Sequence, residues 1–158
     1  MPNLQTKVTF KMKGLEELNK NLKRKIAVNI GVLGKNNARN DGASNASIGV
    51  LHEFGSFSQH LPARSWLKMP LEIKQDELTG AVAEAIETAI LEPNGITTIF
   101  RRAGIACEKI IQEGFETGGF GNWAPLSPAT IKEKKGNTRI LIDTSQLRRS
   151  ITSEVINQ

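Results

Sequence analysis

The order of apolar and polar positions predicts three short strands. Residues 4–12 (Leu-Gln-Thr-Lys-Val-Thr-Phe-Lys-Met) alternate apolar and polar side chains, and residues 151–156 do so again near the end of the chain. Alternation with a period of two is typical of a half-exposed strand. Residues 26–33 are more continuously apolar and predict a second, more buried strand. We expect the three segments to form a small antiparallel sheet.

Apolar residues at three- and four-residue spacing predict the helices. A short amphipathic helix is expected over residues 15–25, and one or two helical turns over residues 46–54. Longer stripes run over residues 70–91 and 96–111, separated by a Glu-Pro-Asn-Gly break, and predict two long antiparallel helices. A Ser-Pro pair that suits a helix start predicts a last short helix over residues 127–136.

These elements predict an α+β fold, in which a small antiparallel sheet of two N-terminal strands and one C-terminal strand packs against two long antiparallel helices. Residues 34–45 and about 116–126 are rich in Asn, Gly or both and lack periodicity, which predicts long, mobile loops. The chain has 158 residues and 39% hydrophobic content, which fits one domain spanning residues 1–158.

Six of the eight aromatic residues lie in two irregular, Gly-, Ser- and Pro-containing windows; they are Phe54, Phe57 and Trp66, and Phe115, Phe120 and Trp123. Aromatic side chains supply much buried area at a small conformational cost, so rings on irregular segments favour anchors that fill pockets on a neighbouring surface. The alternative is that both windows fold back and cap the chain's own core. The ring pattern by itself leaves both interpretations open.

The sequence lacks the residue patterns that catalysis or cofactor binding requires. His52-Glu53 begins like a zinc-hydrolase motif, but Ser56 stands where the second histidine is needed, and His60 has no cysteine near it. The single cysteine, Cys107, lies in an apolar stripe, which predicts a packed, unreactive thiol. We therefore expect no catalytic residues, no metal and no cofactor. The apolar runs are also too short to span a bilayer, and the N-terminus shows no signal pattern, so we expect a soluble protein.

The net charge of +5 is unevenly distributed along the chain. Residues 1–25 hold seven basic and two acidic residues, whereas residues 70–100 hold one Lys and six acids. This asymmetry fits a basic face toward nucleic acid, or head-to-tail complementarity between copies of the chain; a merely solvated charged surface is the third interpretation. A small basic protein that binds double-stranded DNA is therefore the alternative function.

Four short motifs occur in a fixed order: Ile-Gly-Val-Leu-His-Glu-Phe-Gly at 48–55, Leu-Pro-Ala-Arg-Ser-Trp-Leu at 61–67, Trp-Ala-Pro-Leu-Ser-Pro-Ala-Thr-Ile at 123–131 and Leu-Ile-Asp-Thr-Ser-Gln-Leu-Arg-Arg-Ser-Ile at 141–151. In this order the chain resembles the virion-morphogenesis and tail-completion proteins of tailed bacteriophages. It departs from that pattern at Ser145, where members usually carry Gly, and at Ser65-Trp66, where they usually carry Pro and Phe.

The resemblance implies a non-enzymatic structural subunit of the virion, made in the host cytoplasm and placed at the head-tail junction. It implies a homo-oligomeric ring, hexameric by the resemblance, that contacts the tail tube protein and the connector or stopper proteins, with genomic DNA as a possible contact in the lumen and no membrane. Candidate interface residues are Phe54, Phe57, Arg64, Trp66, Phe120, Trp123, Arg148 and Arg149. Arg64 is expected to pair with Glu53, either fixing its own loop or crossing between subunits.

Overall fold

The sheet has two strands. The computed structural model describes residues 13–39 and 42–157, and within them β1 (Ile26–Val32) pairs antiparallel with β2 (Ile151–Asn157). The predicted three-stranded sheet is therefore wrong for this part of the chain, and the expected strand over residues 4–12 lies outside it. Two strands suffice here because α5 (Gly95–Thr117) packs along both of them.

The helices also differ from the prediction of two long ones, because the described residues form seven α-helices, most of them short. In chain order they are α1 (Lys13–Lys23), α2 (Asn45–Phe54), α3 (Lys68–Ile73), α4 (Gln75–Ala89), α5, α6 (Pro128–Glu133) and α7 (Gln146–Arg149). The fold class is α+β, but the detailed architecture expected from the sequence is corrected to this arrangement.

The predicted helix over residues 70–91 is broken at Lys74, whose ψ of 26° lies outside the helical range. The break lets α3 turn so that the buried ring of Pro70 lies against Gly114 of α5, where an added Cβ would be 2.9 Å from the ring. Both α3 and α4 pack against α5, so the apolar stripe continues through the break. Periodicity alone therefore predicted one helix where there are two.

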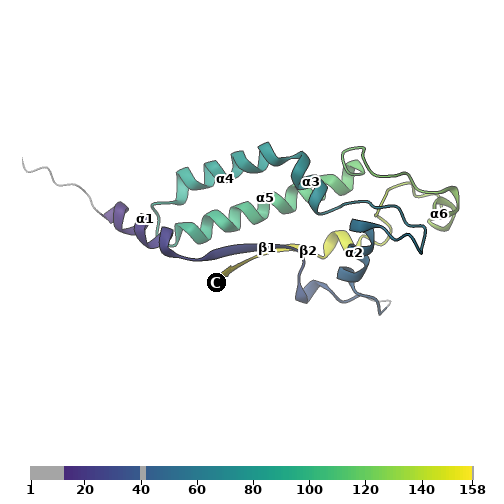
Figure 1. Ribbon diagram of the computed structural model, residues 1–158, viewed down its shortest axis with the longest axis horizontal. Helices are drawn as coiled ribbons and strands as arrows, with labels where there is room; N and C mark the ends of the chain where they lie inside the picture. Colours follow the sequence, from purple (N-terminus) through teal and green to yellow (C-terminus); the bar gives the residue numbers. More distant parts are fainter. Residues whose placement is uncertain (1–12, 40–41, 158) are drawn as a thin grey trace, which may run out of the picture.

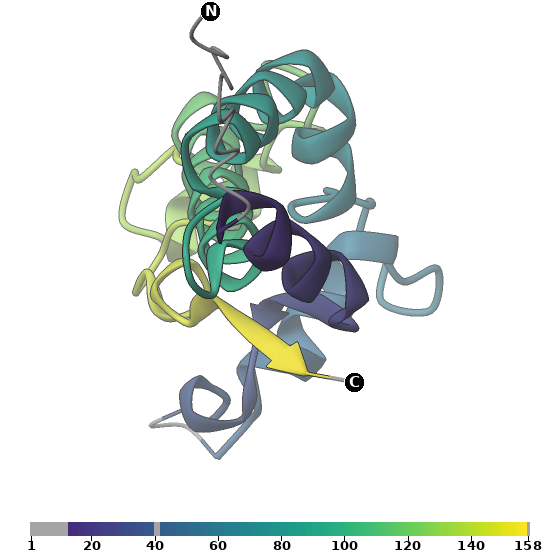
Figure 2. The ribbon, with the colours of Figure 1, turned by 90° about the vertical axis from the view of Figure 1, so that its left-hand side faces the viewer.

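The helices α4 and α5 and the sheet form three successive layers (Figure 1). Viewed along the long axis, both helices lie on the same side of the strands (Figure 2). The close approach of α5 to the sheet depends on Gly104, because a Cβ there would lie 2.6 Å from Ser153 Oγ and 3.1 Å from Val28 Cγ2. A helix carrying any larger residue at this position would have to move away from the strands.

Two hydrophobic clusters lie along α5. The larger one contains the buried side chains of Trp66, Ile111, Phe115, Trp123, Ile142, Leu147 and Ile151. The smaller one joins Ala85 and Ala89 of α4 to Ile99 of α5. Most of the buried large side chains therefore lie toward the C-terminal half of α5, where the motif segments of the sequence converge.

The chain before β1 is attached to the far end of this framework. The buried side-chain amide of Asn21 donates to the carbonyl oxygens of Ile90 at 2.7 Å and Glu92 at 3.1 Å. Arg24 donates to the side chains of Asn94 and Asn157 at 3.0 and 3.1 Å. Helix α1 is thus fixed to the α4–α5 turn.

Across the described ranges, no helix combines the length and apolar character needed to cross a bilayer.

Candidate assembly site formed by the motif segments

Three aromatic rings join the two halves of the motif pattern. The ring centroid of Phe115 lies 6.0 Å from that of Trp66 and 5.6 Å from that of Trp123. The indole N–H groups are satisfied within the same chain, because Trp66 donates to Gly49 O at 2.8 Å and Trp123 donates to Ser65 O at 2.9 Å. The structure places both indoles in the chain's own core, which is the alternative that the sequence left open.

The carboxylate of Glu53 acts as the N-terminal cap of α3 from another helix. It accepts hydrogen bonds from the backbone N–H groups of Trp66 (2.8 Å), Leu67 (2.9 Å) and Lys68 (3.1 Å), and from Ser65 Oγ (2.6 Å). The N–H groups of Leu67 and Lys68 are among those that a helix start leaves without internal partners, and an anion is favoured there. The last turn of α2 is thereby fixed to the first turn of α3.

Arg64 joins the earlier motifs to the later ones. Its Nε donates to Ala124 O at 2.9 Å and its Nη2 to Pro125 O at 3.1 Å, and the residue is only 5% exposed. Burial lowers the pKa of this guanidinium from its usual value. Within the subunit the predicted Glu53–Arg64 pair does not form, because each side chain fixes a loop through backbone groups rather than through the other. A pair between subunits stays a prediction.

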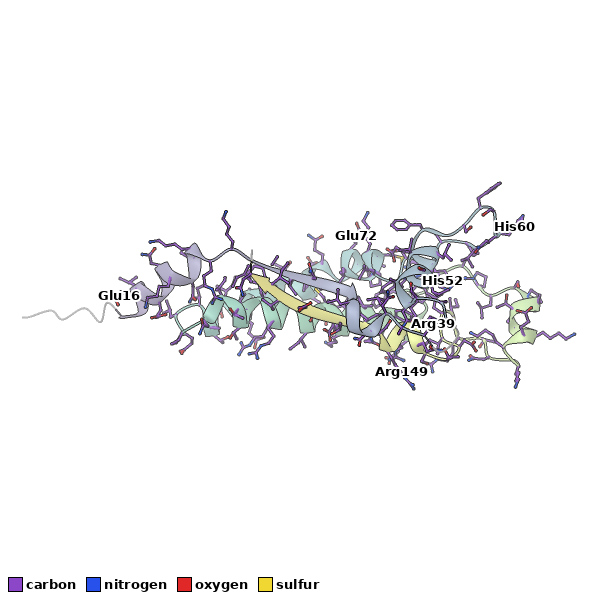
Figure 3. The ribbon with its side chains drawn as sticks, turned by 90° about the horizontal axis from the view of Figure 1, so that it is seen from below. Glu16, Arg39, His52, His60, Glu72 and Arg149 are labelled. Carbon is purple, nitrogen blue, oxygen red and sulfur yellow. The ribbon has the colours of Figure 1, made fainter. Side chains whose placement is uncertain are left out.

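The segment between α2 and residue 64 is a closed loop. Ser56 and Leu61 exchange two backbone hydrogen bonds of 2.9 Å, and Arg64 N donates to His52 O at 2.7 Å. Gly55 permits this closure with a φ of 72°, because a Cβ there would be 2.7 Å from the backbone N of Ala63. The loop is therefore held by backbone contacts at its base and extends beyond the body of the molecule, where His60 is labelled in Figure 3.

Two phenylalanines project from this loop and the helix before it. Phe54, the last residue of α2, is 75% exposed, and Phe57 is fully exposed. We call this pair the aromatic tip. Val50, one helical turn before Phe54, is 57% exposed and extends the same apolar surface. Of the rings predicted to be anchors, these two remain available to a partner.

Phe120 is held by its own chain in the second predicted loop. Its ring is half-buried, and Lys74 Nζ lies 5.3 Å from the ring centroid, within cation–π range. The segment around it is closed by hydrogen bonds from Gly119 N to Gly114 O (2.7 Å) and from Trp123 N to Gly118 O (3.1 Å). The structure thus gives residues 118–123 a defined turn on the C-terminal end of α5.

The two arginines predicted as interface residues have different surroundings. Arg148 donates to Gln112 Oε1 at 2.6 Å and forms an ion pair of 2.5 Å with Glu116, so it secures α7 to α5. Arg149 is exposed and points away from the body of the molecule (Figure 3). Ser145, which replaces the glycine usual in the resembled family, has a φ of 60°, so this chain adopts the left-handed conformation with serine.

A pocket of about 560 Å³ lies between the motif segments. Its charged lining residues are Arg39, Arg64, Lys134 and Asp143, and both histidines of the chain, His52 and His60, also line it. The apolar part of the lining includes Leu61, Pro62, Leu126 and Leu141. No pattern in the sequence brought Arg39, Lys134 or Asp143 to this site, because their proximity depends on loops far apart along the chain.

The basic groups of the pocket are held in fixed positions. Lys134 Nζ donates to the carbonyl oxygens of Arg139 at 2.5 Å and Ile142 at 2.8 Å, and burial lowers its pKa. Burial and the nearby charge of Arg64 lower the pKa of His52, so this imidazole is neutral at pH 7. Its Nδ1 is buried without a hydrogen-bond partner among the described residues. The arrangement suits binding of an acidic group.

The described residues show no arrangement of side chains typical of a metal centre, since no three His, Cys, Asp or Glu residues converge in them. Cys107 is buried, and burial, with a smaller contribution from Glu108, raises the pKa of its thiol. A thiol in this state is a poor nucleophile at neutral pH.

Comparisons of the chain with protein-family models, with curated proteins and with solved structures found no match, so the resemblance to phage tail-completion proteins stays a prediction.

Proposed function

We propose that this chain is a non-catalytic structural subunit of a tailed-phage virion, which completes the tail or joins it to the head as part of an oligomeric ring at the neck. The proposal starts from the four ordered motifs and their resemblance to that family. The structure supports the proposal because residues from all four motifs pack in or against the larger hydrophobic cluster and line the pocket described above. Under this proposal the neighbours are sister subunits, the tail tube protein and the connector or stopper proteins.

The observation that carries the proposal is the aromatic tip. Phe54, at the end of α2, and Phe57, on the loop that follows, place large apolar surfaces in solvent, and backbone hydrogen bonds close the base of that loop. An exposed ring on a preorganised loop loses little conformational entropy on binding and gains much from burial. Such a tip is typical of a residue pair that fills a pocket on an adjoining protein.

The decisive experiment is imaging of phage particles made without this protein. Filled heads and complete tails that accumulate separately support a joining role, and tails of uncontrolled length support a terminating role. Normal, infectious virions would reject the proposal.

Variants of the tip test whether it makes the contact. Phe54→Ser/Phe57→Ser should abolish or strongly reduce complementation of a phage lacking the protein, while the variant chain remains folded. The matched control is Leu15→Ser/Leu22→Ser on α1, which removes two other exposed large side chains, 56% and 68% exposed, at the opposite end of the molecule. Equal loss of infectivity in both double variants would contradict a specific role for the tip.

Binding to double-stranded DNA is the second candidate, and the exposed side chains of Lys23 and Lys25 beside the charge of +5 favour it. A dedicated DNA binder should hold free duplex with an affinity that falls steeply as salt rises. A ring subunit should bind free duplex poorly at all salt concentrations. Measuring binding to a labelled duplex over a salt series distinguishes the two.

A further inference from the structure

The pocket carries an excess of positive charge. Arg64 and Lys134 contribute two positive charges to the lining and Asp143 one negative charge, an excess of one positive charge that does not depend on Arg39, whose guanidinium donates to Asn45 Oδ1. Arg64 and Lys134 are held by backbone carbonyl oxygens, which accept hydrogen bonds but do not neutralise the charge. An acidic group entering this pocket would meet cations that are already positioned.

The outer face of α4 has the opposite character. Asp76, Gly80, Ala83, Glu84 and Glu87 are all exposed, and their spacing of four, three, one and three residues places them on one side of the helix. No ion pair involves Asp76, Glu84 or Glu87 within the described residues. The small residues let another backbone come close, and Ile86, 44% exposed, adds apolar area beside the acids.

These two surfaces lie on different parts of the molecule. Helix α4 is the outermost layer above α5 (Figure 1), whereas His52, His60 and Arg39 mark the pocket end, opposite Glu16 of α1 (Figure 3). One chain therefore cannot place its own α4 face on its own pocket. Contact between different patches of two copies is head-to-tail and generates a ring when the rotation closes.

We propose that the pocket of one copy receives the carboxylates on the outer face of α4 from a second copy. This inference rests on the proposed function, for which it names the subunit contact. From the sequence, head-to-tail contact between copies would pair the acidic residues 70–100 with the basic residues 1–25. The proposed contact replaces that basic partner with the pocket.

Phosphates of duplex DNA fit the pocket less well than carboxylates on side chains. Arg64 is recessed at 5% exposed and Lys134 is half-buried, so a broad, convex duplex surface does not reach both. A glutamate side chain is slender and extends several ångströms from its helix. The apolar lining from Leu61, Pro62 and Leu126 also suits an amphipathic protein surface better than a sugar-phosphate backbone.

Two charge-changing variants test the proposal. The pocket variant, Gln59→Glu/His60→Asp/Thr144→Glu, changes only exposed lining residues and lowers the formal charge of the lining by three, which makes its net charge negative. Asp suits position 60 because His60 has a φ of 51°, a region that Asp tolerates. The helix variant, Glu84→Lys/Glu87→Lys, reverses the α4 face. Sedimentation of the full chain over a concentration series reports self-association.

The wild-type chain should self-associate, and each variant alone should associate at least about tenfold more weakly, because like charges then meet. An equimolar mixture of the two variants should regain association. In the mixture the acidic pocket meets the lysine face, and the unchanged pocket meets the unchanged acidic face. A monomeric wild type, or a mixture as weak as its components, would overturn the proposal.

Matched controls change the same charge elsewhere. Asn19→Asp/Lys23→Glu on α1 lowers the charge by three, as the pocket variant does, and Glu16→Lys/Glu154→Lys raises it by four, as the helix variant does; all four side chains are exposed. Both controls should associate like the wild type, and thermal melting should show every variant folded. If the controls also lose self-association, net charge rather than the contact between the pocket and α4 explains the weaker association, and the proposal is wrong. The proposed function would still hold in that case if particles made without the protein show the head-tail or tail-length defect.

Discussion

Glu53 shows how a single side chain can fix the path of two segments. Its four accepted hydrogen bonds satisfy the start of α3, whose own capping position, Leu67, supplies no side-chain acceptor. The sequence predicted that Glu53 and Arg64 fix a loop, but it assigned them to each other. Charge alone suggested that pairing, whereas both side chains have backbone partners made available by the fold.

We expect Glu53→Ala to lower the free energy of unfolding by about 2–3 kcal/mol, because charge-assisted hydrogen bonds to partly buried N–H groups are lost. Urea unfolding measures the change. Glu72→Ala is the control, since its carboxylate is exposed and makes only a 3.5 Å surface pair with Lys68, worth about 0–1 kcal/mol. Equal midpoints for the two variants would contradict the capping role.

His52 should make stability depend on pH. Its pKa is lowered in the folded chain by burial and by Arg64, so the unfolded chain binds the proton more readily. The contribution of neutral His52 to the free energy of unfolding is fully present above its pKa in the unfolded chain, about 6.5. This contribution is lost as the pH falls from there through the pKa of His52 in the folded chain. Urea unfolding at a series of pH values should show this loss, with a smaller slope in His52→Gln. Gln59→Ala, which changes an exposed, non-titrating side chain on the adjoining loop, should keep the wild-type slope.

At the scale of elements, local pattern predicted some features and missed others. The continuously apolar segment at residues 26–33 and the alternating one at 151–156 correspond to β1 and β2, and the stripe over residues 96–111 lies within α5. Periodicity missed the break at Lys74 because α3 and α4 both face α5. The pocket was missed as well, since it joins residues about 60 to 100 positions apart along the chain, and only tertiary packing brings such residues together.

Two helical glycines test the packing of α5 on the sheet. Gly104→Ala should destabilise the chain by about 1–3 kcal/mol, because its Cβ would overlap Ser153 and press on Val28. Gly80→Ala in α4 meets open space and should stabilise by about 0.5–1 kcal/mol through helix propensity. Thermal unfolding of both variants gives the comparison. The close approach of α5 would be refuted if the two substitutions shifted the melting temperature in the same direction.

For the whole molecule, α5 connects the larger hydrophobic cluster around Phe115 to the smaller one around Ile99. Cys107 is buried between them on the same helix, so its thiol reports whether the two ends unfold together. A chain whose clusters share one continuous helix should unfold as one cooperative unit.

Cooperative unfolding predicts that a substitution that destabilises the larger cluster also exposes Cys107 in the middle of α5 more often. Glu53→Ala acts at the larger cluster, and a loss of about 2 kcal/mol raises the population of the unfolded chain by about 30-fold. The rate at which a disulfide reagent labels Cys107 without denaturant should rise by about the same factor when labelling is limited by the open population. If Glu53→Ala lowers the urea midpoint but leaves the labelling rate of Cys107 unchanged, the two hydrophobic clusters unfold separately, and the prediction of one cooperative unit is wrong.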